Sequence, residues 1–244
     1  MSTKPLIVIT GASSGFGAKT AQLFNSKGFP LLLLARRTEK IKELPLNFDN
    51  VLIENVDVTN KEELQKAITK AEAIHGPTDL LVNNAGIMLL GNILDQDEEE
   101  WQKMLQTNVI GVLNGMKAVL GHMIERNHGT IINVSSIAGF KAFLDHAAYA
   151  ASKFGVHGLT ETIRQEVADS HVRVSLISPG AAETELLTHV TNEQSFNDYV
   201  SWKESMGGLT LDPQKVAESI FFIYEMPQEV TIREISIAAT KQQA

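Results

Sequence analysis

The most conspicuous absence from this chain of 244 residues is cysteine, of which it has none. Disulfide bonds, thiolate catalysis and cysteine-ligated metal sites are therefore excluded. Positive charge is also scarce: 21 basic residues stand against 29 acidic ones, and the net charge of −8 argues against nucleic acid as a partner. No apolar run approaches the roughly 20 residues of a membrane span, and the first apolar run lacks the cleavage site of a signal peptide. We therefore expect a cytoplasmic protein with no membrane partner.

Short apolar segments alternate with helical patterns along the chain. Residues 31–35 are typical of a buried parallel strand, and apolar side chains recur at helical spacing from Leu64 to Ile74. This alternation favours a parallel sheet covered on both faces. We expect an α/β fold, a doubly wound parallel seven-stranded sheet of the Rossmann type, in a single domain spanning residues 1–244. The expected strands are Leu6–Thr10, Leu31–Ala35, Val51–Asp57, Leu80–Asn83, Thr130–Ser135, Val172–Ile177 and Glu234–Ile237.

A glycine-rich segment follows the first expected strand. The sequence Thr10-Gly11-Ala12-Ser13-Ser14-Gly15-Phe16-Gly17 leads from that strand into a helical pattern. Glycines permit a tight turn and a close approach of the backbone to a pyrophosphate, which then lies at the positive N-terminus of the helix. The alternative is a Gly/Ser-rich turn of an ordinary α/β protein. The order of strand, glycine loop and helix favours a dinucleotide site.

Tyr149 and Lys153 are four residues apart, so in a helix their side chains lie on one face. A free tyrosine titrates near about 10 and is a poor proton acceptor at neutral pH. A positive charge nearby lowers the pKa of the tyrosine and suits it to general acid/base catalysis. The alternative is a chance pair on a surface helix. His146, three residues before Tyr149, is expected to make a structural hydrogen bond in a loop rather than to line a pocket.

Three further segments place polar groups beside apolar ones. Leu80-Leu81-Val82-Asn83-Asn84-Ala85-Gly86 runs from an apolar strand into a polar turn. Asn108 interrupts the apolar stripe of a helix expected from Trp101 to Met123, and a polar side chain there requires a hydrogen-bond partner inside the protein. Residues 130–136 form an expected strand that ends in two serines, and the second of them, Ser136, lies 13 residues before the tyrosine.

With these motifs the chain resembles the short-chain dehydrogenase/reductase family over nearly its whole length. The family's T-G-x-x-x-G-x-G stands at Thr10 to Gly17, its N-N-A-G at Asn83 to Gly86, its Y-x-x-x-K at Tyr149 to Lys153 and its Pro-Gly turn at Pro179-Gly180. The resemblance implies a nicotinamide-dependent carbonyl/alcohol oxidoreductase. The residues expected to carry catalysis are Ser136, Tyr149, Lys153 and Asn108. Those expected to bind the cofactor are Gly11, Ser13, Ser14, Gly15, Phe16, Gly17, Arg36, Arg37, Asp57, Val58, Asn84, Ala85, Gly86, Tyr149, Lys153, Pro179, Gly180 and Thr184, and none is expected to bind a metal.

The resemblance also implies a role for each catalytic group. Hydride passes between NADP(H) and a carbonyl carbon, Tyr149 exchanges a proton with the carbonyl oxygen, and Ser136 holds that oxygen by a hydrogen bond. Lys153 lowers the pKa of Tyr149 and binds the nicotinamide ribose, and Asn108 holds a water that links Lys153 to solvent. The expected partner is a small-molecule carbonyl or alcohol substrate.

The end of the second expected strand bears on the choice of cofactor. NAD enzymes of this fold usually place an acidic side chain there for the ribose 2′-hydroxyl, whereas here Ala35 is followed by Arg36 and Arg37. Guanidinium groups suit a 2′-phosphate and predict NADP(H), unless the two arginines simply begin a surface helix. By family resemblance, Asp57 and Val58 would lie at the adenine.

A long segment near the C-terminal end lacks a regular pattern. Between Thr184 and the helix that Asp212-Pro213 is expected to open lie 27 residues, and an irregular loop of that length is usually functional. We expect residues 185–211 to form a lid of short helices over cofactor and substrate. The alternative is a permanently packed helical hairpin. Tyr199 and Trp202 are expected to pack under this segment or to contact the substrate.

Two helices are expected to mediate oligomerisation. The helix from Trp101 to Met123 and the helix from Tyr149 to about Ser170 match those that pair between subunits in this family. Both carry more apolar residues than one buried face requires, including Leu113, Val119 and Leu159. We expect a homodimer or a homotetramer.

Other function classes stay open at this point. A cofactor-binding sensor or scaffold without turnover would be expected to lose Tyr149, Lys153 or Ser136, and none of these is lost. A lyase or epimerase would use the same site. The ending of the chain, an expected strand at 234–237 and a short polar tail, resembles the branch that oxidises 3-hydroxy acids and reduces simple carbonyls.

Overall fold

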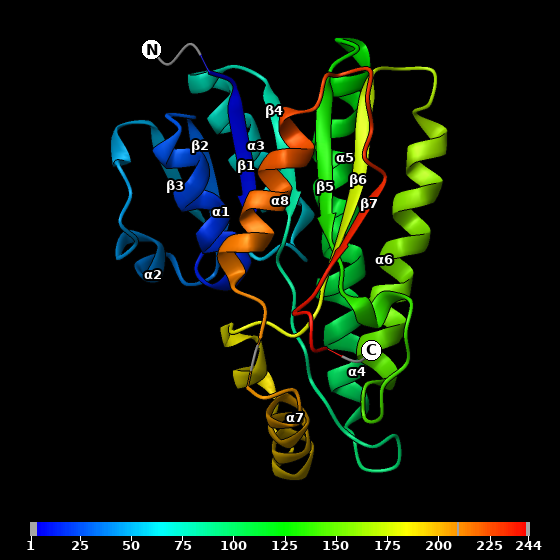
Figure 1. Cartoon of the computed structure of the whole chain (residues 1–244). Coiled ribbons are helices and arrows are strands. Elements are labelled where there is room, and N and C mark those ends of the chain that lie inside the picture. Colours follow the sequence, from blue (N-terminus) through cyan, green and yellow to red (C-terminus); the bar gives the residue numbers. More distant parts are fainter. Residues whose placement is uncertain (1–3, 209, 243–244) are drawn as a thin grey trace.

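A seven-stranded parallel sheet forms the centre of the computed structural model, which describes residues 4–208 and 210–242 (Figure 1). The strands are β1 (Leu6–Thr10), β2 (Leu31–Ala35), β3 (Val51–Asn55), β4 (Thr78–Asn83), β5 (Gly129–Val134), β6 (Val172–Pro179) and β7 (Glu234–Ile237). Their order across the sheet is β3-β2-β1-β4-β5-β6-β7, and every neighbouring pair is parallel. The expected doubly wound α/β fold is confirmed.

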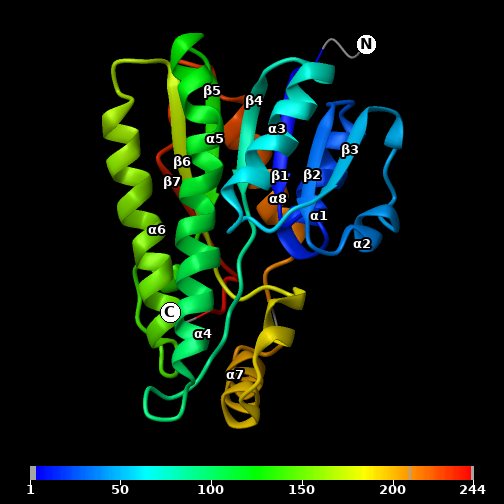
Figure 2. The same cartoon turned by 180° about the vertical axis from the view of Figure 1, so that it is seen from behind.

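Helices cover both faces of this sheet, with α1 and α8 on one face and α3, α5 and α6 on the other (Figures 1 and 2). The helices are α1 (Gly15–Ser26), α2 (Thr38–Lys42), α3 (Lys61–His75), α4 (Glu98–Leu105), α5 (Gly111–Glu125), α6 (Ala147–Glu166), α7 (Glu193–Ser205) and α8 (Pro213–Glu225). Within the described residues, no helix has both the length and the apolar character that crossing a bilayer would need.

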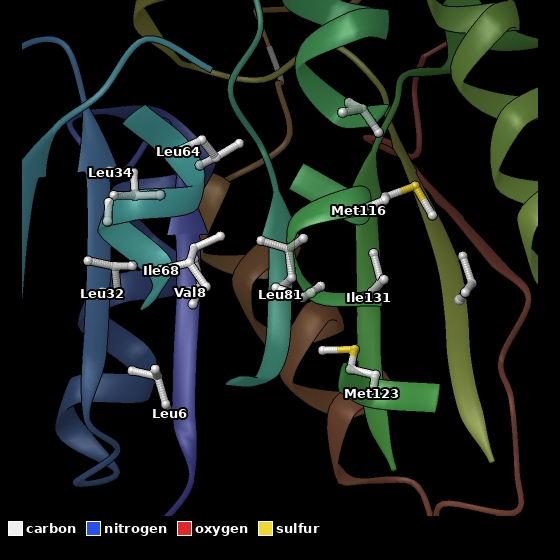
Figure 3. Packing of buried hydrophobic residues seen from close by; sticks show 14 of the residues in the cluster. Leu6, Val8, Leu32, Leu34, Leu64, Ile68, Leu81, Met116, Met123 and Ile131 are labelled. Atoms are coloured by element: carbon white, nitrogen blue, oxygen red, sulfur yellow. The ribbon is translucent and has the colours of Figure 1, made fainter. Parts of the chain in front are cut away.

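Strand residues alternate between two apolar cores because successive side chains point to opposite faces of a sheet. From β1, Leu6 and Val8 pack toward α3 and α5, whereas Ile7 and Ile9 pack toward α1 and α8. Figure 3 shows the first of these cores, in which Leu81 and Ile131 lie close to Met116 and Met123. The two cores fix the sheet between its helical layers and hold the strand ends in place.

The chain changes direction across the sheet at β1. Ile7 of β1 pairs with Leu31 of β2 on one side and with Leu80 of β4 on the other. The loops after β1 and β4 therefore leave toward opposite sides and open a crevice at the carboxyl ends of these strands, where ligands bind in open α/β sheets. The glycine loop lies at this point.

The expected strands are confirmed, with ends that differ by up to two residues. β3 ends at Asn55, so Asp57 and Val58 lie in the loop beyond it, and β6 extends through Pro179. The expected cap of α8 is also present, since Asp212 Oδ1 accepts a hydrogen bond from the Gln214 backbone N–H at 2.9 Å.

Two expectations about side chains on helices are corrected, and two about the helices themselves are refined. Ile74 does not face the core at the end of α3 but is half exposed, and Val119 is buried in the core rather than available to a partner subunit. The short helices expected within residues 185–211 are present as a 3-10 turn at Glu185–His189 and the 13-residue helix α7. The expected helix from Trp101 to Met123 is present, but it consists of α4 and α5 joined by a π turn over Gln106–Ile110.

Candidate active site

The glycine loop has the backbone geometry that its sequence predicts. Gly11 and Gly15 adopt φ values of +64° and +52°, a region that favours glycine. A Cβ on Gly11 would lie 2.8 Å from Ala85 Cα, and a Cβ on Gly17 would lie 2.4 Å from the Gly11 carbonyl oxygen. The Gly11 side of the loop therefore packs directly on the segment after β4, and the rest of the loop lines a cavity of about 890 Å³.

The Asn-Asn-Ala-Gly segment after β4 holds this loop in place. Thr10 Oγ1 accepts hydrogen bonds from the backbone N–H groups of Asn84 and Ala85, both at 3.0 Å. The Asn84 side chain donates in return to the carbonyl oxygens of Thr10 and Gly11, at 3.0 and 3.1 Å. Two motifs that are about 70 residues apart in sequence thus form one rigid wall of the cavity.

Tyr149 and Lys153 lie on the first turns of α6 and both face the cavity. Both side chains are buried, at 4% and 7% exposure. Lys153 Nζ donates a hydrogen bond to the Val134 carbonyl oxygen at 3.1 Å and lies 5.7 Å from the centre of the Tyr149 ring. The Ser136 side chain caps the short turn after β5 by accepting a hydrogen bond from the Ala138 N–H, and it also interacts with the Tyr149 hydroxyl. The three groups come together as the sequence predicts.

Burial controls the protonation of this group. It raises the pKa of the Tyr149 phenol above its ordinary value, and the hydrogen bond with Ser136 opposes this rise in part. Burial also lowers the pKa of the Lys153 ammonium to about 8. The lowering of the Tyr149 pKa that the sequence led us to expect from Lys153 is therefore outweighed by desolvation. The phenol carries its proton at neutral pH and is available as an acid.

Asn108 lies on the π turn between α4 and α5 and is almost completely buried. Its Oδ1 accepts a hydrogen bond from the Ile87 N–H, and its Nδ2 donates to the Ile87 carbonyl oxygen, both at 2.9 Å. Nδ2 also donates to Ser152 Oγ on α6 at 3.0 Å. The internal partner expected for this side chain is confirmed, and its amide ties the segment after β4 to α6. Single π turns of this kind are frequent at functional sites.

The two arginines after β2 lie at the opposite end of the cavity from Tyr149, and both contact acidic groups. Arg36 Nη1 is 3.9 Å from Asp57 Oδ2, and Arg37 Nη2 donates to Glu185 Oε2 at 2.9 Å. Lys40 Nζ binds the other oxygen of Glu185 at 2.7 Å, and the hydrogen bonds from Lys40 and Arg37 lower the pKa of this carboxyl. Neither Lys40 nor Glu185 was found by sequence reasoning, since Glu185 is 148 residues away from Arg37.

The segment after β6 closes the cavity between these two ends. Thr184 Oγ1 accepts a hydrogen bond from the Leu186 N–H and caps the 3-10 turn that carries Glu185. Gln242, which sequence reasoning also missed, accepts a hydrogen bond from the Ala181 N–H at 2.9 Å. Its Nε2 is buried without a hydrogen-bond partner in the described part of the chain. Pro179 and Gly180 line the cavity beside it.

Aromatic side chains from α7 and from the loop before α6 line the cavity beside Tyr149. We call Phe143, His146, Tyr199 and Trp202 the aromatic wall. His146 both makes a structural hydrogen bond and lines the cavity: its Nδ1 is 2.5 Å from the Leu144 carbonyl oxygen, and its ring faces the cavity. Tyr199 and Trp202 also line it, and burial raises the pKa of Tyr199 to about 12. Phe143 had no signal in the sequence beyond its aromatic character.

One cavity thus collects nearly all the residues that the sequence singled out. Gly17 and Asn108 do not line it but support it from behind through close backbone packing and hydrogen bonds. The predicted residues that line it are Gly11, Ser13, Ser14, Gly15, Phe16, Arg36, Arg37, Asp57, Val58, Asn84, Ala85, Gly86, Ser136, Tyr149, Lys153, Pro179, Gly180 and Thr184.

Relatives and solved structures share this architecture. An uncharacterised oxidoreductase of Listeria monocytogenes is 35% identical over 243 residues, which is 97% of each chain. The closed form of a serine dehydrogenase complexed with NADP+ superposes with a TM-score of 0.90 at 30% identity over 98% of this chain and 96% of that one. The NADP-bound structure of ElxO gives a TM-score of 0.84 at 28% identity over 96% and 97% of the two chains.

The sequence model of the short chain dehydrogenase family matches residues 5–195, which include the glycine loop and the Tyr149 helix. The matched region therefore covers six of the seven strands, the glycine loop and the helix of Tyr149 and Lys153, and it ends before Tyr199 and Trp202. With the seven-stranded parallel sheet and the relatives just described, the chain belongs to the short-chain dehydrogenase family of oxidoreductases.

Proposed function

We propose that this protein transfers hydride between NADP(H) and a small carbonyl or hydroxyl compound, with Tyr149 as the general acid/base. The observation that carries this proposal is the meeting of Ser136, Tyr149 and Lys153 in the cavity that the glycine loop and Pro179-Gly180 also line. A sensor or scaffold without turnover would have no use for this group of three side chains. The burial of Tyr149 and Lys153 costs solvation energy and requires a functional return.

The cavity fits a dinucleotide. Its glycine loop leaves no room for a Cβ at Gly11, has positive φ at Gly15 and opens directly into the N-terminus of α1. We infer that this end binds the pyrophosphate through backbone N–H groups. The cofactor, when bound, supplies or accepts the hydride, and the protein supplies orientation and protons.

The protein's own chemistry follows from the protonation of its side chains. When the carbonyl carbon takes up hydride, negative charge grows on the oxygen. Tyr149, neutral at physiological pH, donates its proton to that oxygen, and the Ser136 hydroxyl holds the oxygen by a hydrogen bond. Lys153, charged below its pKa of about 8, stabilises the phenolate that remains and binds the nicotinamide ribose. Asn108 positions α6 through Ser152 and would hold a water that links Lys153 to solvent.

We propose NADP(H) rather than NAD(H) as the cofactor. Arg36, Arg37 and Lys40 gather at the end of β2, where a ribose 2′-substituent would lie, and no acidic residue ends that strand. The serine dehydrogenase and ElxO structures, both solved with NADP bound, support the same choice. Glu185 forms ion pairs with Arg37 and Lys40, and these pairs would have to break for a 2′-phosphate to bind both cations.

The experiment is NADPH consumption measured against a panel of ketones, aldehydes and 3-oxo acids, with the Tyr149→Phe variant in parallel. This variant keeps the ring and removes the proton donor, so turnover should fall by at least about 100-fold while NADPH still binds. Near-normal turnover by Tyr149→Phe would refute the assignment of Tyr149 as the general acid/base. Equal titration affinity for NADPH and NADH in the unaltered protein would remove the cofactor preference.

Within a single domain, we propose that residues 185–211 act as the substrate lid. The 3-10 turn and α7 carry Glu185, Tyr199 and Trp202 onto the cavity, one side chain at the cofactor end and two at the substrate end. Hydrogen exchange across residues 186–208 should slow when NADPH and a substrate analogue are added. Protection confined to the glycine loop would favour a permanently packed segment instead.

We also propose a homodimer or homotetramer formed through α4, α5 and α6. In Figure 2, α4 and α5 follow one another end to end and α6 lies beside them. The apolar side chains of Leu105, Leu113 and Phe154 on these helices are exposed. A stable monomer in light scattering at micromolar concentration would overturn this. Leu113→Glu should dissociate the assembly, whereas Ile74→Glu, at a half-exposed apolar residue on α3, should not.

A further inference from the structure

The substrate end of the cavity is built from rings. The centres of Tyr199 and Trp202 are 5.4 Å apart, Trp202 and Phe143 are 6.0 Å apart, and Phe143 and His146 are 5.6 Å apart. His146 continues the wall toward the reacting group, since its ring centre is 6.1 Å from that of Tyr149. The aromatic wall thus begins beside the phenol and extends over the length of a second ring. Such a surface prefers flat apolar partners, which pack on it in stacked or edge-to-face geometry.

Charge at this end is negative. The carboxylates of Asp145, Glu183 and Asp198 line the cavity. The neighbouring ammonium, Lys203 Nζ, is held by Glu183 at 2.9 Å. His146 does not supply a positive charge at neutral pH because burial lowers its pKa, although the Leu144 carbonyl and Asp145 oppose this shift. With Lys203 balancing Glu183, a carboxylate on the substrate would meet a net excess of two negative charges here, from Asp145 and Asp198.

The cationic side chains that line the cavity lie away from the aromatic wall or are paired with other groups. Arg36 and Arg37 lie at the far end beyond the glycine loop, and Lys153 Nζ is directed to the Val134 carbonyl oxygen beneath Tyr149. Among the described residues that line the cavity, none places an unpaired guanidinium or ammonium beside the aromatic wall. A site for a 3-hydroxy or 3-oxo acid would need such a group, because an unpaired carboxylate in a partly buried site is costly.

We propose that the substrate is an uncharged ketone or aldehyde, or the corresponding alcohol, that carries an aromatic ring a few bonds from the reacting carbon. This rests on the proposed function, since it assigns the carbonyl to Tyr149 and Ser136. The ring packs on Phe143, His146 and Trp202 while the carbonyl oxygen takes the proton of Tyr149. It also departs from the 3-hydroxy acids that the ending of the chain suggests, because the carboxylate of those acids finds no partner here.

A matched series of four ketones tests the proposal. Butanone provides the carbonyl without a ring, benzylacetone adds the ring, and benzylacetone with a para-carboxylate or a para-trimethylammonium group adds charge of either sign. We expect kcat/KM for NADPH-dependent reduction to be at least tenfold higher for benzylacetone than for butanone and than for the carboxylate. A carboxylate reduced as well as benzylacetone would overturn the proposal. A trimethylammonium ketone preferred tenfold over benzylacetone would replace it by a cation site.

Trp202→Ala and Asp145→Asn, with Phe196→Ala as a control, separate the contribution of the aromatic wall from that of the negative charge. Trp202→Ala should lower the ratio of kcat/KM for benzylacetone over butanone by about fivefold or more, mainly through KM. Phe196→Ala, which removes an aromatic ring from the same helix but outside the cavity, should leave this ratio unchanged. Asp145→Asn should raise the ratio for the carboxylate over benzylacetone severalfold. Its backbone φ of +60° is one that asparagine adopts readily, and the hydrogen bond from Ser195 Oγ has an oxygen to accept it.

Calorimetric titration makes the result independent of turnover. Benzylacetone should bind Tyr149→Phe in the presence of NADP+, and Trp202→Ala in that background should weaken this binding at least fivefold. Turnover of 3-oxo acids but not of benzylacetone, with Tyr149→Phe inactive, would leave the proposed function standing and overturn the substrate class. If no carbonyl compound is reduced but benzylacetone binds and Trp202→Ala weakens it, the proposed function fails and the aromatic subsite stands. Absence of both turnover and binding of benzylacetone would overturn the substrate class.

Discussion

Glu185→Gln is the substitution that most directly tests how the cofactor site is controlled. In the structure the Glu185 carboxylate binds Arg37 at 2.9 Å and Lys40 at 2.7 Å, so it holds the two cations that a 2′-phosphate would need. The side chains involved are about 40% exposed, and exposed pairs contribute roughly 0.2–1 kcal/mol each. Releasing both pairs therefore costs NADPH about 0.4–2 kcal/mol, which corresponds to a factor of roughly 2 to 30 in Kd.

We expect Glu185→Gln to bind NADPH more tightly by this factor and NADH with unchanged affinity, because NADH has no phosphate to compete with the carboxylate. Fluorescence titration of both cofactors at fixed ionic strength measures this, and the effect should shrink in high salt. Glu39→Gln is the matched control: it removes one negative charge from α2, whereas Glu39 forms no ion pair with Arg37 or Lys40. Weaker NADPH binding by Glu185→Gln would mean that Glu185 orients Arg37 for the phosphate, and the competition argument would be refuted.

Three further outcomes are expected. Reductive kcat/KM should fall as pH rises above about 8, because Lys153 loses its charge there. Over the range from about 8 to 10.5 the free energy of unfolding should rise, because the unfolded chain then binds more protons than the native one. Parallel pH profiles of the reaction rate and of urea unfolding check both effects. Asn108→Leu should lower the free energy of unfolding by about 2–5 kcal/mol in urea titration, because the Ile87 N–H and carbonyl lose their buried partner, and a loss below about 1 kcal/mol would mean that water replaces the amide. Arg36→Ala should weaken NADPH binding by about 1–3 kcal/mol and leave NADH binding unchanged, and an equal loss for both cofactors in titration would contradict a contact with the 2′-phosphate.

Much of the site could be predicted because its chemistry is local in sequence. The glycine loop needs positive φ at Gly11 and Gly15 and close approach at Gly17, so the pattern that permits this backbone is visible within eight residues. The same holds for Tyr149 and Lys153, whose shared helix face follows from a spacing of four. Parallel strands of four to eight residues are near-continuous apolar runs, which is why all seven were found and only their ends moved.

The protonation of Tyr149 and Lys153 could not be predicted in the same way. The spacing of Tyr149 and Lys153 correctly places one positive charge near the phenol, but the pKa also depends on how much water the surrounding chain removes. Burial arises from segments distant in sequence, and it raises the pKa of Tyr149 while lowering that of Lys153. Opposite shifts of this kind leave one group as an acid and the other as a charge that titrates near physiological pH.

Short helices were expected within residues 185–211, but the bounds of α7 could not be predicted, for a physical reason. Helical periodicity appears in a sequence when one face is buried in the core, yet α7 has only Ser195 buried and turns Tyr199 and Trp202 toward the cavity. Its one local signal was the cap, since Asn192 Oδ1 accepts a hydrogen bond from the Ser195 N–H at 2.9 Å. A helix that gains little from the core depends on its cap and on what fills the cavity, and so its stability should respond to ligands more than that of α1 or α8. Because Ser195 is the one buried residue of α7, we expect this segment to serve the substrate more than the fold.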